Sequence, residues 1–258
     1  MAAPAVAAQA CGAPAAEAAL GSERSGWSEF DAASRRLVRE AGSLATVAVG
    51  LAGDCGAWHW QGRWQHAQGS RDYDGASNNG VPLRTTSAIR RERASLQAWH
   101  RFNGAYALGV EGRWTQLHRD IASAAGVSGY PERFSAWQAA LGAGYTWPEV
   151  GGMRVGVEAW LGAGPAGHVD VALPGLDAAR LRLGASRSAR VGLSLSSGDE
   201  LAVAPGWQWR LRLELQQERT RAGRPQPLYR QGALYGAAVQ PKFEQTSAAL
   251  SAGMAYRF

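Results

Sequence analysis

The feature that most constrains the fold is a two-residue alternation of apolar and polar side chains, which recurs along the chain after residue 26. In the segment 207–215 the order is Trp-Gln-Trp-Arg-Leu-Arg-Leu-Glu-Leu. Successive side chains of a β-strand point to opposite faces of its sheet, whereas helical side chains return to one face about every 3.6 residues. The pattern therefore predicts an all-β protein whose strands have one apolar and one polar face.

The predicted connections alternate in length along the chain. Short turns are expected at 53–56, 103–104, 148–152 and 187–189, and longer polar loops at 71–87, 120–133, 164–178 and 198–204. Asn103-Gly104 is typical of a two-residue hairpin turn. We predict about twelve antiparallel strands, including 179–186, 190–197 and 228–239, with ten as the alternative if the first segment is an extension.

Composition excludes several classes of protein. Hydrophobic residues make up 46% of the chain, but no run of about eighteen apolar residues forms a membrane-spanning helix. The net charge is +6, but the sequence contains no basic run or motif that would indicate a nucleic-acid partner. No clustered His and Cys residues indicate a metal site, so neither a metal nor another cofactor is expected.

The positions of aromatic residues decide which face points outward. They gather near the ends of the predicted strands, as expected for belts at the two membrane–water interfaces. The polar faces are also rich in glycine, which would leave room in a narrow lumen for long side chains. The predicted interface aromatics are Trp58, Trp60, Trp114, Trp137, Tyr145, Trp147, Trp207, Trp209, Tyr256 and Phe258. We therefore predict a closed antiparallel transmembrane β-barrel with short periplasmic turns and longer extracellular loops.

The last strand resembles the C-terminal signal of bacterial outer-membrane β-barrels. Phe258 is the final residue, Tyr256 stands two residues before it, and Gly253 lies a few residues upstream. The resemblance implies a Gram-negative outer-membrane location and insertion by the barrel-assembly machinery through this strand. The lipid and lipopolysaccharide of that membrane would then surround the protein.

The N-terminal region is expected to lie outside the barrel. Ala8-Gln9-Ala10 has the small-x-small form of a signal-peptidase site, so residues 1–24 are interpreted as a signal remnant or a disordered segment and 25–258 as the barrel. Cys11 in this segment is not expected to pair with Cys55. The alternative is that Cys11 follows a lipoprotein cleavage site.

The polar face of the strands suggests what the lumen would do. The predicted lumen-lining residues are Arg63, Arg91, Arg93, Arg101, Arg113, Arg154, Arg180, Arg182, Arg190, Arg210, Arg212, Glu111, Glu158 and Glu214. This surplus of arginine would raise the local concentration of anions in a water-filled lumen. It resembles the small arginine-lined porins that pass acidic sugars, and so favours a porin-like, non-enzymatic channel with anion preference. The alternative is a salt-bridged plug in a structural or loop-presenting barrel.

An enzymatic alternative rests on residues near the predicted extracellular rim. Asp72-Tyr73-Asp74, His118-Arg119-Asp120 and His168-Val169-Asp170 all lie on the long-loop side. Their spacing resembles that of the omptins, which place an Asp pair and an Asp–His pair at this rim, although the order of each His–Asp pair is reversed here. Asp and Gly are also ordinary turn residues. No catalytic residue is therefore assigned.

Overall fold

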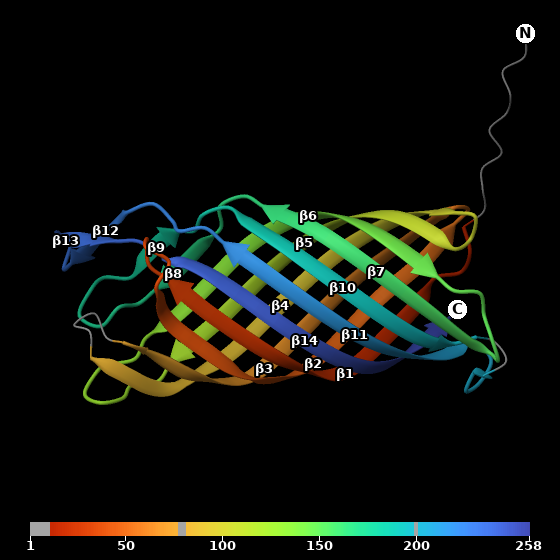
Figure 1. Cartoon of the computed structure of the whole chain (residues 1–258), viewed down its shortest axis with the longest axis horizontal. Helices are drawn as coiled ribbons and strands as arrows, with labels where there is room; N and C mark the ends of the chain where they lie inside the picture. The colour runs from red at the N-terminus through yellow and green to blue at the C-terminus, as the bar shows by residue number, and fades with distance from the viewer. Residues whose placement is uncertain (1–10, 77–80, 199–200) are drawn as a thin grey trace, which may run out of the picture.

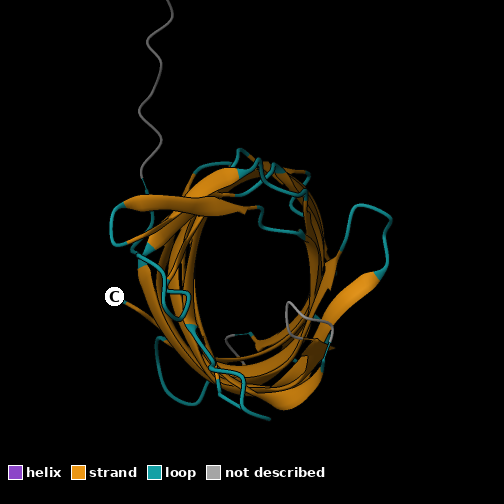
Figure 2. Cartoon of the chain, turned by 90° about the vertical axis from the view of Figure 1, so that its left-hand side faces the viewer, coloured by secondary structure: helices purple, strands orange, loops and turns teal. Residues whose placement is uncertain are grey.

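Ten strands close into one antiparallel barrel in the computed structural model, which describes residues 11–76, 81–198 and 201–258. The order is β5-β4-β3-β2-β1-β14-β11-β10-β7-β6, and pairing of β5 with β6 completes the ring (Figures 1 and 2). The barrel strands are β1 (Ala15–Phe30), β2 (Arg36–Cys55), β3 (Trp58–Ala76), β4 (Pro82–Phe102), β5 (Tyr106–Ile121), β6 (Pro131–Thr146), β7 (Met153–Gly164), β10 (Ser186–Ser197), β11 (Trp207–Thr220) and β14 (Lys242–Arg257).

Four shorter strands lie beyond the ring and correct two predictions. β8 (His168–Val171) pairs with the part of β6 that β7 does not reach, and β9 (Ala179–Arg182) pairs with β8. The predicted turn at 187–189 is wrong, since Ser186–Ser197 is one continuous strand. The predicted strand 228–239 is also wrong, because β12 (Gln226–Arg230) and β13 (Ala233–Ala238) form a separate hairpin (Figure 1). The barrel therefore has ten strands rather than about twelve.

Both ends of the described chain lie at the same end of the barrel, where the β2–β3 and β4–β5 connections are tight (Figure 1). Strands β4 and β5 join there through Asn103 and Gly104, whose φ angles of 52° and 71° are both in the left-handed region. Asn and Gly adopt this region with little steric cost, which explains the turn. The opposite end carries β8, β9, β12 and β13. This asymmetry is the one expected of short periplasmic turns and longer extracellular loops, but two of the predicted long loops are wrong. Most of 71–87 is strand, because β3 runs to Ala76 and β4 begins at Pro82. The predicted loop 198–204 joins β10 to β11 at the end of the tight turns.

The outer surface of the barrel has a lipid-facing band. On β5 the outward residues Tyr106, Leu108 and Val110 are 60%, 58% and 53% exposed, and Trp114 pairs in register with Trp137 of β6. Tyr106 and Trp114 are eight residues apart, or about 20 Å along the axis of a barrel with tilted strands. This is close to the thickness of the apolar band of outer-membrane barrels. Among the described residues, no helix is long and apolar enough to cross a membrane.

Most of the predicted interface aromatics gather at the periplasmic end of the strands. Trp114 and Trp137 instead lie toward the extracellular end of the lipid-facing band, paired side by side. The others are near the periplasmic ends of β3, β6, β11 and β14 or follow them directly: Trp58, Trp60, Tyr145, Trp147, Trp207, Trp209, Tyr256 and Phe258. The distribution agrees with two interfacial belts, of which the periplasmic one is better populated.

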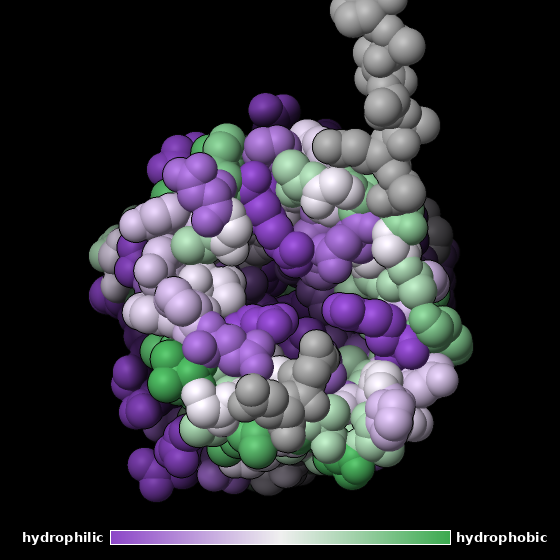
Figure 3. Space-filling model, turned by 90° about the vertical axis from the view of Figure 1, so that its right-hand side faces the viewer, coloured by the Kyte–Doolittle hydropathy of each residue, from purple (hydrophilic) through white to green (hydrophobic). Residues whose placement is uncertain are grey.

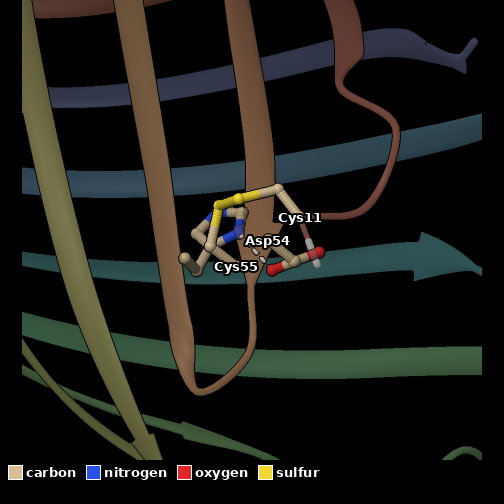
Figure 4. Close-up of a disulfide and its surroundings, with 4 residues drawn as sticks. Cys11, Asp54 and Cys55 are labelled. Atoms are coloured by element: carbon tan, nitrogen blue, oxygen red, sulfur yellow. Dashed lines mark hydrogen bonds and ion pairs between the residues drawn. A yellow bond between two sulfur atoms is a disulfide. The ribbon is translucent and has the colours of Figure 1, made fainter. Parts of the chain in front are cut away.

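The N-terminal segment is tied to the barrel, contrary to expectation. β1 begins at Ala15, so ten residues assigned to the leader belong to the barrel wall, where they pair with β2 and β14. Cys11 forms a disulfide with Cys55 at the end of β2 (Figure 4). The Gly12 amide also donates to the Asp54 carbonyl at 2.8 Å. The prediction that these cysteines do not pair is therefore wrong. A disulfide-bonded Cys11 has no free sulfur for a lipoprotein linkage.

Removal of the disulfide should lower stability without opening the ring. The bridge joins residues 44 positions apart. A closed loop of this length stabilises the folded state by about 4 kcal/mol at most in the chain-entropy model. We expect Cys11→Ser/Cys55→Ser to fold into a heat-modifiable barrel that unfolds at lower urea concentration. Dithiothreitol should shift the wild type but not the variant, and equal shifts of both would contradict the bridge.

Candidate functional site

An apolar cluster crosses the lumen in its extracellular half. Trp27 of β1 stacks on Phe243 of β14 with centroids 4.2 Å apart and meets Phe134 of β6 edge-on at 5.1 Å. Inward residues of the other strands complete this cluster, which we term the septum: Trp27, Leu44, Ala67, Ile89, Leu117, Phe134, Val169, Val171, Leu181, Leu183, Leu228 and Phe243. Its members are at most 7% exposed. Aromatic and aliphatic side chains of the barrel strands β1 to β6 and β14, together with those of the β8, β9 and β12 region, therefore pack across the lumen at this level.

Arg119 is the centre of a buried ionic cluster on the extracellular side of the septum. Its Nε donates to Glu40 at 2.9 Å, and its Nη1 donates to Glu29 at 2.7 Å and to Glu132 at 2.9 Å. The guanidinium carbon also lies 5.2 Å from the Trp27 ring centroid. Since Arg119 is only 2% exposed, three carboxylates from β1, β2 and β6 converge on one buried cation.

The periplasmic side of the septum is filled by Arg–Glu pairs. Arg91 makes two hydrogen bonds to Glu23, at 2.8 and 2.5 Å. Arg190 donates to Glu111 at 2.6 Å. Arg63 and Arg210 both donate to Glu17, which lies between them. These pairs connect strands that are not neighbours, so the side chains bridge the lumen rather than line it.

Two tryptophans narrow the lumen nearer its periplasmic mouth. Trp99 and Trp160 meet edge-on with centroids 4.4 Å apart, and both are buried. A Cβ on Gly109 would lie 2.6 Å from the Trp99 ring, and one on Gly142 would lie 2.5 Å from the Trp160 ring. Glycine on the inward face therefore makes room for aromatic rings as well as for charged side chains.

Most predicted lumen residues do face inward, and each of those arginines has an acidic partner. Arg93 lies 3.9 Å from Glu214, and Arg113 lies 4.0 Å from Glu111. Arg212 pairs with Glu158 and with Glu214. At the periplasmic mouth, Arg101 pairs with Asp54 at 2.9 Å and Arg154 pairs with Glu149 at 3.0 Å. All nine inward arginines of the prediction thus have a carboxylate within 4.0 Å.

Arg180 and Arg182 are the exceptions and do not line the lumen. They lie on β9, and the buried, inward residues here are Leu181 on the strand and Leu183 directly after it. Arg180 is on the outer surface, with its side chain 68% exposed, and pairs with Asp170 at 2.6 Å. The prediction failed there because the strand polarity inverts above the membrane, where apolar side chains point inward and polar ones outward.

Several buried charged residues of the lumen were not predicted. They are Glu17, Glu23, Glu29, Glu40, Arg71, Arg119 and Glu132. The alternation along β5 could have predicted that Arg119 faces the lumen, because it shares one face of the strand with the predicted Glu111 and Arg113. It was instead grouped with His118 and Asp120 as a rim residue. Glu17 and Glu23 were not predicted because β1 was expected to begin at about residue 26, after both of them.

The largest cavity in the lumen opens at the periplasmic end. It measures about 230 Å³ and is bounded by Trp99, Arg101, Arg154, Glu158 and Arg210, among others. Figure 3 shows this end of the barrel with hydrophilic residues around a central hollow. Deeper cavities near Arg93 measure only about 40 and 30 Å³. Of these three cavities, the one at the periplasmic mouth is by far the most spacious.

The rim residues of the enzymatic alternative do not converge in the lumen. Asp72 and Asp74 are exposed on the outer face of β3, while Tyr73 between them is buried. His118 and Asp120 likewise lie on the side of β5 opposite to Arg119 and Ile121. His168 lies 4.0 Å from Asp170, which Arg180 already binds. Among the described residues, no group of three or more His, Cys, Asp or Glu residues is placed to hold a metal ion.

The comparisons with known proteins define the fold. No family model and no curated protein sequence matches the chain. Among solved structures, it is similar to the outer membrane protease OmpT from Escherichia coli, with 14% identity, 95% of this chain and 97% of that chain covered, and a TM-score of 0.53.

Two further solved structures are less similar. The translocator domain of autotransporter NalP from Neisseria meningitidis has 11% identity, coverages of 94% and 88%, and a TM-score of 0.49. The β domain of the Bordetella autotransporter BrkA has 16% identity, coverages of 95% and 100%, and a TM-score of 0.46. The closed ring, the lipid-facing band and the OmpT-like fold together make this chain a bacterial outer-membrane β-barrel, located in that membrane.

Loss of Arg119 should destabilise the barrel far more than loss of an exposed arginine. Arg119→Gln would leave Glu29, Glu40 and Glu132 buried without their shared cation, and breaking a buried ion pair in this way costs about 3–5 kcal/mol. Arg180→Gln is the matched control, because its exposed pair with Asp170 is worth under about 1 kcal/mol. Urea unfolding in detergent micelles measures both, and similar losses would exclude a central role for Arg119.

Glu132 should make stability depend on pH. It lies beyond Trp137 toward the extracellular end of β6, outside the lipid-facing band. Burial, together with the nearby Glu29 and Glu40, raises its pKa from 4.5 to about 7 against the opposing effect of Arg119. The folded state then binds more protons than the unfolded state between these two values, so stability falls as pH rises, by at most about 1.4 kcal/mol per pH unit for one proton.

The test compares unfolding at pH 5 and pH 8. We expect the wild type to lose stability over this range and Glu132→Gln to lose less, because glutamine carries no charge at either pH. A parallel loss in both proteins would show that Glu132 is not the titrating group.

Proposed function

We propose that this protein is a sealed outer-membrane barrel that presents its extracellular end and does not conduct solutes passively. The observation that carries the proposal is the septum, whose buried apolar side chains pack across the lumen from β1 to β6 and β14. An ion that crosses among these apolar side chains would lose its hydration water, and the septum residues offer no polar group to replace that water. The function would then lie in the surfaces outside the membrane.

The charges in the lumen support the same conclusion. An anion-preferring pore needs arginines that are free to attract a passing anion. Here Arg91 binds both carboxylate oxygens of Glu23, and Arg190 binds Glu111, all with at most 6% exposure. These ion pairs hold the arginines on carboxylates and so reduce the attraction for a passing anion that the sequence suggested.

A porin-like anion channel is the second candidate function. The observation in its favour is the cavity of about 230 Å³ at the periplasmic mouth, where Arg101, Arg154, Arg210 and Arg212 meet. For passage, the septum and the ion pairs would have to rearrange together. An enzymatic role has less support, because OmpT shares only the fold with this chain and the rim carboxylates Asp72 and Asp74 face outward.

Planar-bilayer recording tests the proposal. We expect the refolded wild type to give no conductance steps at voltages at which a general porin, recorded in parallel, conducts. Trp27→Ala/Phe134→Ala/Phe243→Ala should permit ion flow, because it empties the centre of the septum, and should also lower stability, since each such truncation costs about 3–5 kcal/mol.

The matched control is Trp207→Ala, which removes an aromatic residue of the outer face and should remain silent. Stable conductance steps from the wild type would overturn the sealed-barrel proposal. The reversal potential in a salt gradient would then show whether anions are preferred.

A further inference from the structure

Three basic side chains lie side by side on the outer face of the barrel, beyond the lipid-facing band. Arg90 of β4 pairs in register with His118 of β5, which pairs in register with Arg133 of β6. Their neighbours along the strands, Ile89, Leu117 and Phe134, are buried inward. Because side chains alternate along a strand, the three basic residues, termed the basic row, all point outward.

The two arginines of the basic row are free of acidic partners. Within the described ranges, neither Arg90 nor Arg133 makes an ion pair. Three acids lie on the same outer face. Glu92 pairs with His66 at 2.6 Å, and Asp170, in register with Arg133, pairs with Arg180 at 2.6 Å. Asp120 is exposed two residues beyond His118 on β5. In the lumen, by contrast, each predicted arginine that faces inward lies close to a carboxylate. Arg90 and Arg133 therefore present guanidinium groups that no carboxylate of the described residues binds directly.

A hollow of about 410 Å³ adjoins the basic row. His118, Arg133, Asp170 and Arg180 bound it together with Pro131, Glu132, Val171, Ala172, Ala178 and Ala179. It thus combines positive groups with a largely apolar wall formed by β6, β8 and β9. Such a surface suits a ligand with an anionic group joined to an apolar part.

The height of the row on the barrel identifies the source of this ligand. His118 lies four residues beyond Trp114 on β5, and Arg133 lies four residues from Trp137 on β6. In a tilted strand this spacing is about 10 Å along the barrel axis. Trp residues mark the membrane–water interface, so the row lies at or just above the headgroups, within reach of long arginine side chains.

We propose that the basic row binds a phosphate group of lipopolysaccharide in the outer leaflet. Arg90 and Arg133 would donate charge-assisted hydrogen bonds to the phosphate oxygens, and His118 between them would donate another. An acyl chain or sugar of the same molecule would pack against the wall of the hollow. The inference stands independently of whether the lumen conducts.

Native mass spectrometry of the barrel in detergent, titrated with lipopolysaccharide, tests the site. We expect Arg90→Gln/Arg133→Gln to reduce affinity at least about tenfold. Arg24→Gln/Arg39→Gln is the matched control, since it removes the same charge from exposed positions on β1 and β2, and should change affinity less than about twofold. Heat-modifiable migration checks that both variants are folded barrels.

Two further titrations distinguish the phosphate of a lipid from other ligands. Dephosphorylated lipopolysaccharide should bind the wild type as weakly as intact lipopolysaccharide binds the double variant. Inorganic phosphate should compete only at far higher concentration. The proposal is overturned if both double variants lose affinity equally, if dephosphorylated lipid binds fully, or if inorganic phosphate binds as tightly as the lipid.

Discussion

Closure of the backbone hydrogen-bond ladder is the constraint on which the other features depend. In lipid, an unpaired amide has no water to bind, so a sheet that crosses the membrane must have no open edge. Here β1 pairs with both β2 and β14 along its whole length, and the β5–β6 ladder completes the ring. Once the ring is closed, each wall residue faces either the lumen or the surroundings.

The kind of side chain that faces inward and the kind that faces outward both change along the barrel axis. Within the lipid-facing band, Leu108 and Val110 point outward and Glu111 and Arg113 point inward. Farther along the same strand, Leu117 is buried inward and His118 points outward. The first arrangement is that of a membrane barrel, and the second is that of a barrel in water with its own apolar core. The septum follows directly from this inversion.

The sequence predicted the fold more fully than the site, and the inversion explains much of the difference. Alternation and turn chemistry correctly predicted a closed antiparallel ring and the Asn103-Gly104 turn. The same reasoning placed Arg180 and Arg182 in the lumen, because one rule of polarity was applied along the whole chain. Alternation also gives no information on which inward side chains meet across the lumen. Arg119 and its three carboxylates come from four strands that only the folded ring brings together.

The pairing of the lumen charges also bears on how such a barrel remains closed. Replacing a buried ion pair by apolar residues is often neutral or stabilising, so stability alone does not require arginine and glutamate here. Removal of one partner, however, leaves an unpaired buried charge at high cost. Glu17 binds Arg63 and Arg210 from two other strands, and Glu23 of the same strand binds Arg91. A shift of β1 in register would break all three contacts at once, so the paired charges favour a single register of the closed ring and hold the septum residues in place across the lumen.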